Sequence, residues 1–395
     1  MFFISLEPWH CLRLLVLSAG FFEWSHQGGF AVNKDKKNKK RAKIAMYFVA
    51  FALVVSAGVL LAMLFGRNLL LSMQFGVDKK TPFEDMFTMQ KLEFPAMPPE
   101  HRKAFDVAVL HDDASKEWWY LNAHLLDQYN KRYTLMMAML KDNKFYGILS
   151  DIEYNTAISI AMPQVAVSHE PNHRLFKTGP ATITQPDPNF LCYNFVFSKP
   201  QLDLDLKLCA NKAPMAVGGT GLIEMGEGGV SQYFSLTNMS VSGSGRLMDR
   251  KAKFRGRGWI DRQWGNWNDD NFDRWDWFSI NLMNQTEILL FRFWKDEQVV
   301  HQFGDVHLSS GVTTHQVNFK IDTTASWISP KTHVKWDTGW VITLPEYAAR
   351  FKINADFDDH EVADVLWEGG VKVTGRWQGS DVRGRGFFEA RRKAW

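Results

Sequence analysis

The chain has 395 residues, of which 46% are hydrophobic, so it can bury the cores of two ordinary domains. Its formal net charge is +3, but the first 43 residues carry eight Lys and Arg against three acids, which leaves the remainder slightly acidic. This distribution argues against a nucleic-acid-binding role. The 16 Trp and 30 Phe residues must fill barrel interiors or line an apolar cavity, since few such rings stay exposed.

A cluster of cations precedes the longest uncharged segment of the chain. Seven Lys and Arg lie between residues 34 and 43, and residues 44–65 follow without a charge. At about 1.5 Å per residue this run crosses a hydrocarbon layer of roughly 30 Å as a helix. We expect a single-pass anchor at 44–65, with residues 1–43 as a basic cytoplasmic segment and the following domains outside the cytoplasm, in the periplasm of a Gram-negative cell. The alternative is a cleaved signal peptide, whose apolar region usually covers only about 7–15 residues.

The chain beyond the anchor changes character at a Pro-containing stretch. Residues 66–93 are weakly patterned and are interpreted as a juxtamembrane stalk, and residues 94–100 mark the entrance to the domains. From there, short aromatic and β-branched runs recur between Gly, Asn, Asp and Pro turns. This pattern predicts an all-β fold.

The clearest hairpin covers residues 191–209. Apolar and polar residues alternate on both arms of a two-residue turn, and pairing residues whose numbers sum to 401 sets Phe195 opposite Leu206 on one face. The same register sets Cys192 opposite Cys209. In an oxidising compartment we expect these two to form a cross-strand disulfide, because opposed residues lie within disulfide range. Two buried free thiols are the alternative.

An internal repeat divides the β region into two units. Residues 118–125 resemble residues 275–282 at an offset of 157, and each segment is followed by a second apolar strand that ends in Lys-Asp. Two units of about 150 residues suit two closed or nearly closed barrels, each able to hold one small ligand. We therefore expect barrels at 94–256 and 257–395, with the boundary between Asp249 and Asp276. The alternative is a chance similarity between aromatic strands.

Several motifs together resemble one known family, the AttH-like and hydroxyneurosporene synthase (carotenoid 1,2-hydratase) family. They occur in the family's order at 117–125, 233–237, 258–265, 275–279, 367–369 and 384–389. The resemblance covers about residues 94–395 and implies two tandem lipocalin-like barrels. It also implies members that hydrate carotenoid double bonds and fungal relatives that assist polyene cyclisation. One departure is Arg262, where the family pattern often has His.

The strand at 117–125 carries polar groups among its rings. Trp118, Tyr120, Asn122 and His124 share one face, while Glu117 lies on the other. If the first face lines the lumen, it binds an apolar ligand and orients it with few hydrogen bonds. Alternatively, Asn122 and His124 face solvent and the Trp residues pack between domains. His124 and Glu117 are candidate catalytic groups.

Asp261 is the main candidate for acid chemistry. It lies among Trp259, Trp264 and Trp267, and a carboxyl group desolvated by such rings has a raised pKa. It can then donate a proton to an alkene, while the rings stabilise the resulting cation. The alternative is a structural role, in an ion pair between domains or in hydrogen bonds to a turn.

Two further acids have Trp neighbours. Asp276 lies between Trp275 and Trp277, and Glu368 follows Trp367. Asp276 and Trp277 are candidate ligand-binding residues, although acids in such places often bind indole N–H groups. No nucleotide-binding loop, nucleophile elbow or metal-ligand spacing occurs, so we expect neither a cofactor nor a metal.

These features together predict a membrane-anchored, lipocalin-like protein that binds a hydrophobic isoprenoid, polyene or lipid. Its predicted activity is that of a hydratase or cyclase in which Asp261 donates the proton. A non-catalytic lipid carrier or chaperone, or an envelope assembly factor, is the alternative. An enzyme needs an acid beside the cavity, a carrier needs only the cavity, and an assembly factor needs neither.

Overall fold

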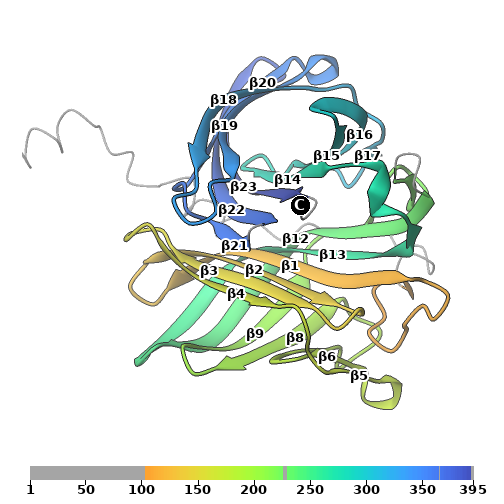
Figure 1. Cartoon of the computed structure of the whole chain (residues 1–395), viewed down its shortest axis with the longest axis vertical. Coiled ribbons are helices and arrows are strands. Elements are labelled where there is room, and N and C mark those ends of the chain that lie inside the picture. The colour runs from red at the N-terminus through yellow and green to blue at the C-terminus, as the bar shows by residue number, and fades with distance from the viewer. Residues whose placement is uncertain (1–102, 226–228, 364, 393–395) are drawn as a thin grey trace, which may run out of the picture. The chain divides into compact units, whose positions relative to one another are not determined.

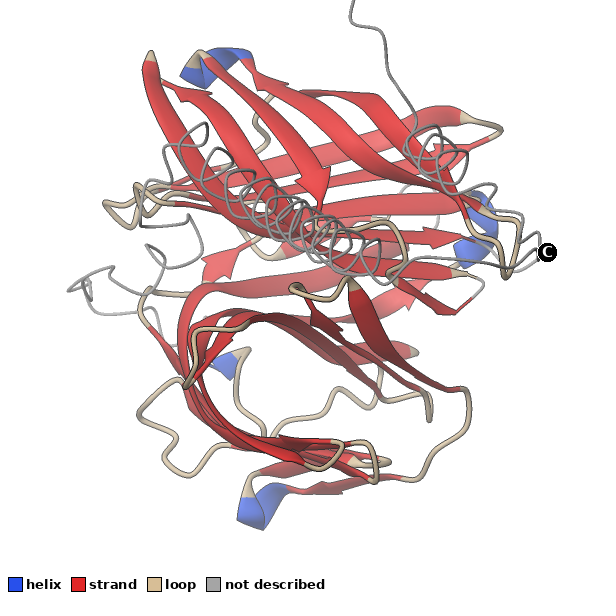
Figure 2. Cartoon of the chain, turned by 90° about the vertical axis from the view of Figure 1, so that its left-hand side faces the viewer, coloured by secondary structure: helices blue, strands red, loops and turns tan. Residues whose placement is uncertain are grey.

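β-Strands make up nearly all the regular structure of this protein (Figures 1 and 2). The computed structural model describes residues 103–225, 229–363 and 365–392, all within a compact unit that spans Lys79–Trp395. No helix in these ranges is long and apolar enough to cross a membrane. The predicted anchor at 44–65 and stalk at 66–93 lie outside the described residues. The all-β prediction is confirmed.

The first sheet contains thirteen described strands, and the pairings among them are antiparallel. Its order is β4-β3-β2-β1-β13-β12-β9-β8-β7-β6-β5, and β10 and β11 pair with β12. The strands are β1 (Lys116–Asp127), β2 (Arg132–Leu140), β3 (Phe145–Asp151), β4 (Thr156–Met162), β5 (Val167–Glu170), β6 (Leu175–Thr178), β7 (Ala181–Thr184), β8 (Cys192–Lys199), β9 (Leu202–Ala210), β10 (Met215–Ala216), β11 (Leu222–Glu224), β12 (Gly229–Leu247) and β13 (Arg250–Trp267).

The second sheet repeats this order with fewer strands. Its order is β17-β16-β15-β14-β23-β22-β20-β19-β18, and β21 pairs with β22. The strands are β14 (Arg274–Leu282), β15 (Glu287–Lys295), β16 (Gln298–His307), β17 (Thr313–Thr314), β18 (Lys320–Ile328), β19 (Lys335–Leu344), β20 (Ala349–Ala355), β21 (Glu361–Ala363), β22 (Leu366–Trp377) and β23 (Ser380–Arg392).

The predicted repeat appears in the topology. β1 and β14 each pair with the next strand on one side and with the last long strand of their own sheet, β13 or β23, on the other. Both sheets curl (Figure 1), but neither strand order closes on itself among the described strands. The fold is therefore two curled half-barrel sheets, an arrangement consistent with tandem lipocalin-like domains.

The change from one sheet to the other lies between Trp267 and Arg274, inside the expected interval of Asp249 to Asp276 but later than residue 256. β13 runs through residue 256 to Trp267 and is a central strand of the first sheet, while the second sheet begins at Arg274. A cut at 256/257 would divide β13. Strand β13 is long because one part of it pairs with β1 and its whole length with β12, so the first unit ends only after Trp267.

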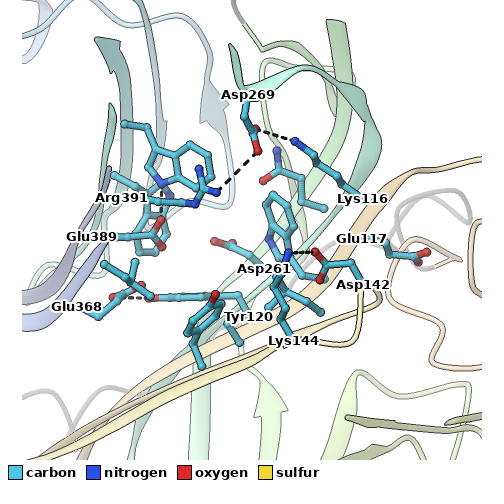
Figure 3. A pocket seen from close by; sticks show the side chains of 18 of the residues that line it. Lys116, Glu117, Tyr120, Asp142, Lys144, Asp261, Asp269, Glu368, Glu389 and Arg391 are labelled. Atoms are coloured by element: carbon cyan, nitrogen blue, oxygen red, sulfur yellow. Dashed lines mark hydrogen bonds and ion pairs between the residues drawn. The ribbon is translucent and has the colours of Figure 1, made fainter. Parts of the chain in front are cut away.

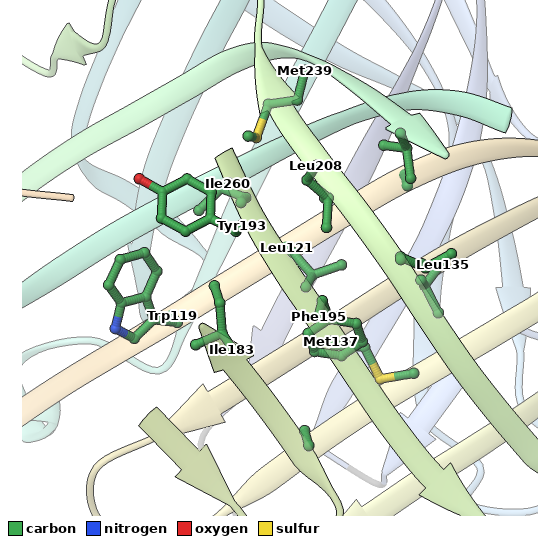
Figure 4. Close-up of a cluster of buried hydrophobic side chains, with 14 of the residues drawn as sticks. Trp119, Leu121, Leu135, Met137, Ile183, Tyr193, Phe195, Leu208, Met239 and Ile260 are labelled. Atoms are coloured by element: carbon green, nitrogen blue, oxygen red, sulfur yellow. The ribbon is translucent and has the colours of Figure 1, made fainter. Parts of the chain in front are cut away.

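Alternation along the strands separates three cores. One core fills the first sheet, with Trp119, Leu121 and Ile260 among its residues (Figure 4). A second core fills the other sheet, and a third lies between the two sheets and includes Tyr120 and Trp277. Apolar side chains therefore fill the interior of each curled sheet and also the space between the two sheets.

The hairpin of β8 and β9 has the predicted register. Phe195 pairs with Leu206 and Cys192 with Cys209, as the sum of 401 requires. The two cysteine sulfur atoms are joined in a disulfide. Phe195 and Leu206 are fully buried in the first core, which explains why this register is favoured over a one-residue slip.

Candidate active site between the two sheets

A cavity of about 220 Å³ lies where the two sheets face each other. Strands β1, β2 and β13 of the first sheet and β14, β15, β22 and β23 of the second contribute its walls. Aromatic, aliphatic and methionine side chains form most of the lining, and the acids that line it include Asp261, Glu368 and Glu389 (Figure 3). The site thus combines an apolar surface with acids from both sheets.

Asp261 is buried and held by three donors. The Ser235 hydroxyl and the Trp259 indole N–H donate to Oδ1 at 2.5 and 2.6 Å, and the Tyr233 hydroxyl donates to Oδ2 at 2.8 Å. Burial raises its pKa to about 7, although the three hydrogen bonds oppose the shift. A carboxyl group with this pKa can hold and release a proton near neutral pH.

Tyr233 links Asp261 to the second sheet. Its hydroxyl donates to Asp261 and accepts a hydrogen bond from the Trp277 indole N–H at 2.9 Å. Burial raises the pKa of Tyr233 well above its usual value, so the hydroxyl remains protonated. Tyr233 therefore fixes the orientation of Asp261 at the cavity wall.

Glu368 and Glu389 face each other on β22 and β23. The Tyr120 hydroxyl donates to Glu368 Oε2 at 3.3 Å, and the Trp275 indole N–H donates to Glu389 Oε1. Burial raises the pKa of Glu368 well above its usual value, and the charge of Glu389 and a hydrogen bond to it add to the shift. Glu368 consequently keeps its proton and shares it with Glu389.

Ion pairs surround the mouth of the cavity. Asp269, in the short 3₁₀ turn 269–271, lies 2.7 Å from the Lys116 ammonium and 3.7 Å from the Arg391 guanidinium (Figure 3). These contacts connect β1 to β23 through the segment between the sheets. Within the described residues, no three His, Cys, Asp or Glu side chains are arranged to hold a metal ion.

Several predicted ligand-binding residues meet at this cavity. Trp118 and Tyr120 of β1 and Trp277 of β14 line it together with Asp261. The face of β1 that carries Trp118 and Tyr120 lies neither in the lumen of the first sheet nor in solvent. It packs against the second sheet, so both alternatives for this face were incomplete.

Asn122 and His124 are buried on the same face of β1, beyond the lining of the cavity. The Asn122 amide donates to the hydroxyls of Tyr120 and Ser279 at 3.3 and 3.2 Å. The His124 ring lies 5.0 Å from Phe387, and burial and the nearby Arg385 lower its pKa well below the usual range. Neutral His124 packs between the sheets and is not part of the cavity lining.

Glu117 is directed into the first sheet, away from the acids (Figure 3). It forms an ion pair with fully buried Arg262 and a 3.0 Å hydrogen bond with His111. Burial alone would raise its pKa, but the contacts with His111 and Arg262 lower it to about 2. An ionised, ion-paired carboxylate cannot donate a proton, so the structure gives no support to Glu117 as a catalytic acid. Arg262, which replaces the family's His, completes this pair.

Three other predicted residues, Trp259, Trp264 and Asp276, do not line the cavity. Trp259 supports Asp261 through its indole N–H, and Trp264 stacks on His111 at 4.0 Å on the opposite face of β13. Asp276 is buried against the core of the second sheet. Burial would raise its pKa, but Arg274 and Arg292 lower it. Alternation along β13 and β14 explains why neighbours of the site residues point away.

Tyr233 and Glu389 are site residues that the sequence did not predict. Both lie in motifs that carry the family resemblance, but neither has a sequence neighbour that marks it as chemical. The available signal was pairing: Glu389 lies opposite Trp277 and Glu368 in the second sheet, as Asp261 lies opposite Tyr120 and Ser235 in the first.

Residues 177–391 match the sequence model of a family described as AttH-like. A dehydratase of Emericella nidulans, asqC, is 22% identical over 219 residues, which cover 51% of this chain and 61% of that protein. The crystal structure of kievitone hydratase from Nectria haematococca is similar with a TM-score of 0.64 at 18% identity, covering 73% of this chain and 93% of the other. The crystal structure of an AttH-type protein from Nitrosomonas europaea is similar with a TM-score of 0.63 at 21% identity. The similarity covers 76% of this chain and 96% of the other. The two structural similarities show a shared fold.

Proposed function

The chain belongs to the AttH-like family, and from this we propose that it adds water to a carbon–carbon double bond of a hydrophobic ligand, or removes water from an alcohol to form such a bond. The observation that carries the proposal is Asp261, a buried acid with a pKa of about 7 at the wall of an aromatic cavity. The names of two relatives, a dehydratase and a hydratase, support the same reaction class.

The proposed hydration begins with proton transfer from the Asp261 carboxyl group to one alkene carbon. The π electron pair forms the new C–H bond, and the other carbon becomes a cation. The π faces of Trp118, Tyr120 and Trp277, which line the cavity, stabilise this cation. Water then attacks the cation, forms the C–O bond with a lone pair and passes a proton to a carboxylate in the cavity wall. Dehydration follows the same steps in reverse, and a cyclase would use the same protonation with an internal double bond in place of water.

The site favours catalysis over simple transport. A lipid carrier requires an apolar cavity, and burying carboxyl groups in its wall would cost free energy without improving binding. Asp261, Glu368 and Glu389 nevertheless reach this cavity from three strands. Their convergence is the feature that a carrier or an assembly factor does not need.

The test uses the full chain in lipid nanodiscs with lycopene, geranylgeraniol or kievitone in water labelled with heavy oxygen. We expect mass spectrometry to detect a product that carries one labelled hydroxyl group. Asp261→Asn should lower the rate by about 10²–10⁴-fold, the usual contribution of a general acid. Asp381→Asn, at an exposed site on β23, is the control and should retain the wild-type rate. An Asp261→Asn protein that folds and hydrates at the wild-type rate would contradict the proposal.

We also propose that residues 44–65 anchor the protein with its β region outside the cytoplasm. The seven cations before this apolar segment support that orientation. The Cys192–Cys209 disulfide fits an oxidising compartment. The test is protease treatment of intact spheroplasts followed by carbonate extraction. We expect the β region to be accessible and the uncleaved chain to remain in the membrane, and release of a shortened chain would favour a signal peptide.

A further inference from the structure

The second sheet contributes a carboxyl pair whose role the proposed function does not specify. Glu368 is buried and Glu389 is half-buried, and both line the cavity. Their strands set them directly opposite each other, where two charged carboxylates would repel. An acidic pair that faces an apolar cavity needs an explanation beyond packing.

The pair holds one proton and therefore one negative charge. Glu368 lies deeper, beside Tyr120, and burial is the largest cause that raises its pKa. Glu389 receives the Trp275 indole N–H and is the more exposed of the two. Burial thus favours the neutral form of Glu368, and Glu389 is the carboxyl group of the pair that lies nearer the cavity surface.

Pseudo-symmetry sets this charge across the cavity from the proton donor. Tyr120 and Trp277 are related by the 157-residue offset, and their rings pack 5.2 Å apart. Tyr120 pairs with Asp261 on β13, and Trp277 pairs with Glu389 on β23. Figure 3 shows the two acids reaching the cavity from different sheets. A ligand atom protonated by Asp261 would thus lie in the field of Glu389.

We propose that Glu389, supported by Glu368, makes this cavity a binding site for a hydrophobic cation. The inference rests on the proposed function and identifies the cation as the carbocation that follows protonation by Asp261. The attacking water forms the new C–O bond with its lone pair, and its proton passes to the Glu389 carboxylate. A proton then returns from the pair to Asp261 through water in the cavity, which restores the starting state.

The same site should bind a stable cation of similar shape. The probe is octyltrimethylammonium, and 1-octanol is the neutral control. Binding is followed by tryptophan fluorescence of the full chain in zwitterionic nanodiscs at about pH 6, where Asp261 is largely protonated. We expect the wild type to bind the cation about tenfold more tightly than does the variant with Glu368→Gln and Glu389→Gln.

Two comparisons make the outcome specific. Asp261→Asn should bind the cation as the wild type does, because it replaces a neutral acid by a neutral amide. Binding of 1-octanol should be equal in all variants, which shows that the cavity remains folded. The inference is overturned if the double variant keeps the preference for the cation, or if the wild type binds neither ligand.

Failure of the proposed function would look different. If the protein binds the cation but hydrates none of the probes, the charged binding site is supported and the proposed reaction is contradicted. If Glu389→Gln hydrates a probe at the wild-type rate, the proposed reaction is supported and the role of the Glu368–Glu389 pair is contradicted.

Discussion

The two sheets offer corresponding strands to one cavity but different chemistry. In the first sheet, Asp261 is surrounded by hydroxyl and indole donors, and its cross-strand neighbour is Ser235. In the second sheet, Glu389 occupies the corresponding position, and its cross-strand neighbour is the acid Glu368. The neutral donors around Asp261 make it a single titratable acid. In the second sheet, Glu368 and Glu389 share one proton, so the pair carries one negative charge. The repeat supplies the geometry twice, and a single neighbour determines the function of each half.

The charges behind the site also differ between the halves. In the first sheet, fully buried Arg262 has Glu117 as its carboxylate partner. In the second, Asp276 lies between two guanidinium groups, those of Arg274 and Arg292. Removing Glu117 leaves the Arg262 charge without a countercharge. Removing one Arg from the second group leaves Asp276 with the other Arg as its countercharge. We therefore expect the first half to be the more sensitive to charge removal.

The largest predicted effect tests this difference. Glu117→Gln should lower the free energy of unfolding by about 3–5 kcal/mol, because it leaves the Arg262 guanidinium buried without a countercharge. Urea unfolding followed by circular dichroism measures the loss. Arg292→Met is the matched change in the second sheet. Asp276 retains Arg274 there, so the loss should be about 1–3 kcal/mol. Equal losses in the two variants would contradict the comparison.

The disulfide provides the next largest effect. Cys192 and Cys209 close a loop across the β8–β9 hairpin, with a sequence separation of 17. Replacing both by Ala should cost roughly 3 kcal/mol in the chain-entropy model. Hydrogen exchange should show lost protection in β8 and β9 but little change in β19 and β20, the corresponding strands of the second sheet. Equal loss in both sheets would mean that they unfold as one unit.

Strand patterning and the repeat allowed much of this fold to be predicted from the sequence. The alternation around Phe195 and Leu206 fixed the register of the hairpin, because only one register buries both arms on one side. The boundary at 256/257 was misplaced because motif spacing does not reveal that β13 continues to Trp267 to pair with two neighbours.

The candidate site was only partly predictable. Alternation shows that Glu117 and Tyr120 lie on opposite faces of β1, but it cannot say which face meets another sheet. That depends on contacts between residues far apart in sequence, such as the Tyr120–Glu368 hydrogen bond. The expectation for Asp261 followed from its Trp neighbours, whereas Glu389 becomes significant only through the strands beside it.

The buried acid should also make stability depend on pH. The pKa of Asp261 rises from 3.8 to about 7 on folding, so its contribution is fully present below about pH 4 and is lost as pH rises through about 7. Between these limits the unfolding free energy should fall by up to about 1.4 kcal/mol per pH unit from this group. Burial also raises the pKa of Glu287 to about 7, so Glu287 lowers the unfolding free energy over the same pH range. This contribution is the same in the wild type and in an Asp261 variant.

Asp261→Asn should therefore flatten the pH dependence without removing it. Urea unfolding at about pH 5 and about pH 7 compares the variant with the wild type. A wild type that gains stability over this range would show that Asp261 is ionised in the folded protein. It would then resemble Glu117, whose lowered pKa has the opposite effect on stability at low pH.

The smallest effect concerns the neighbour that distinguishes the two halves. The Ser235 hydroxyl donates to Asp261 Oδ1 at 2.5 Å and thereby favours the ionised form. Ser235→Ala removes this donor, so the pKa of Asp261 should rise further, by less than about one unit, because Trp259 and Tyr233 still donate. The upper pH limit of hydration should move upward by the same amount.

Ser279→Ala is the control for this shift, because the Ser279 hydroxyl accepts a hydrogen bond from the Asn122 amide rather than donating to Asp261. Each Ala variant should lose about 1 kcal/mol of stability, but only Ser235→Ala should shift the pH profile. A downward shift in Ser235→Ala would mean that the hydroxyl stabilises the protonated acid. Ser235 would then act on Asp261 as Glu389 acts on Glu368, and the two halves of the cavity would be chemically alike.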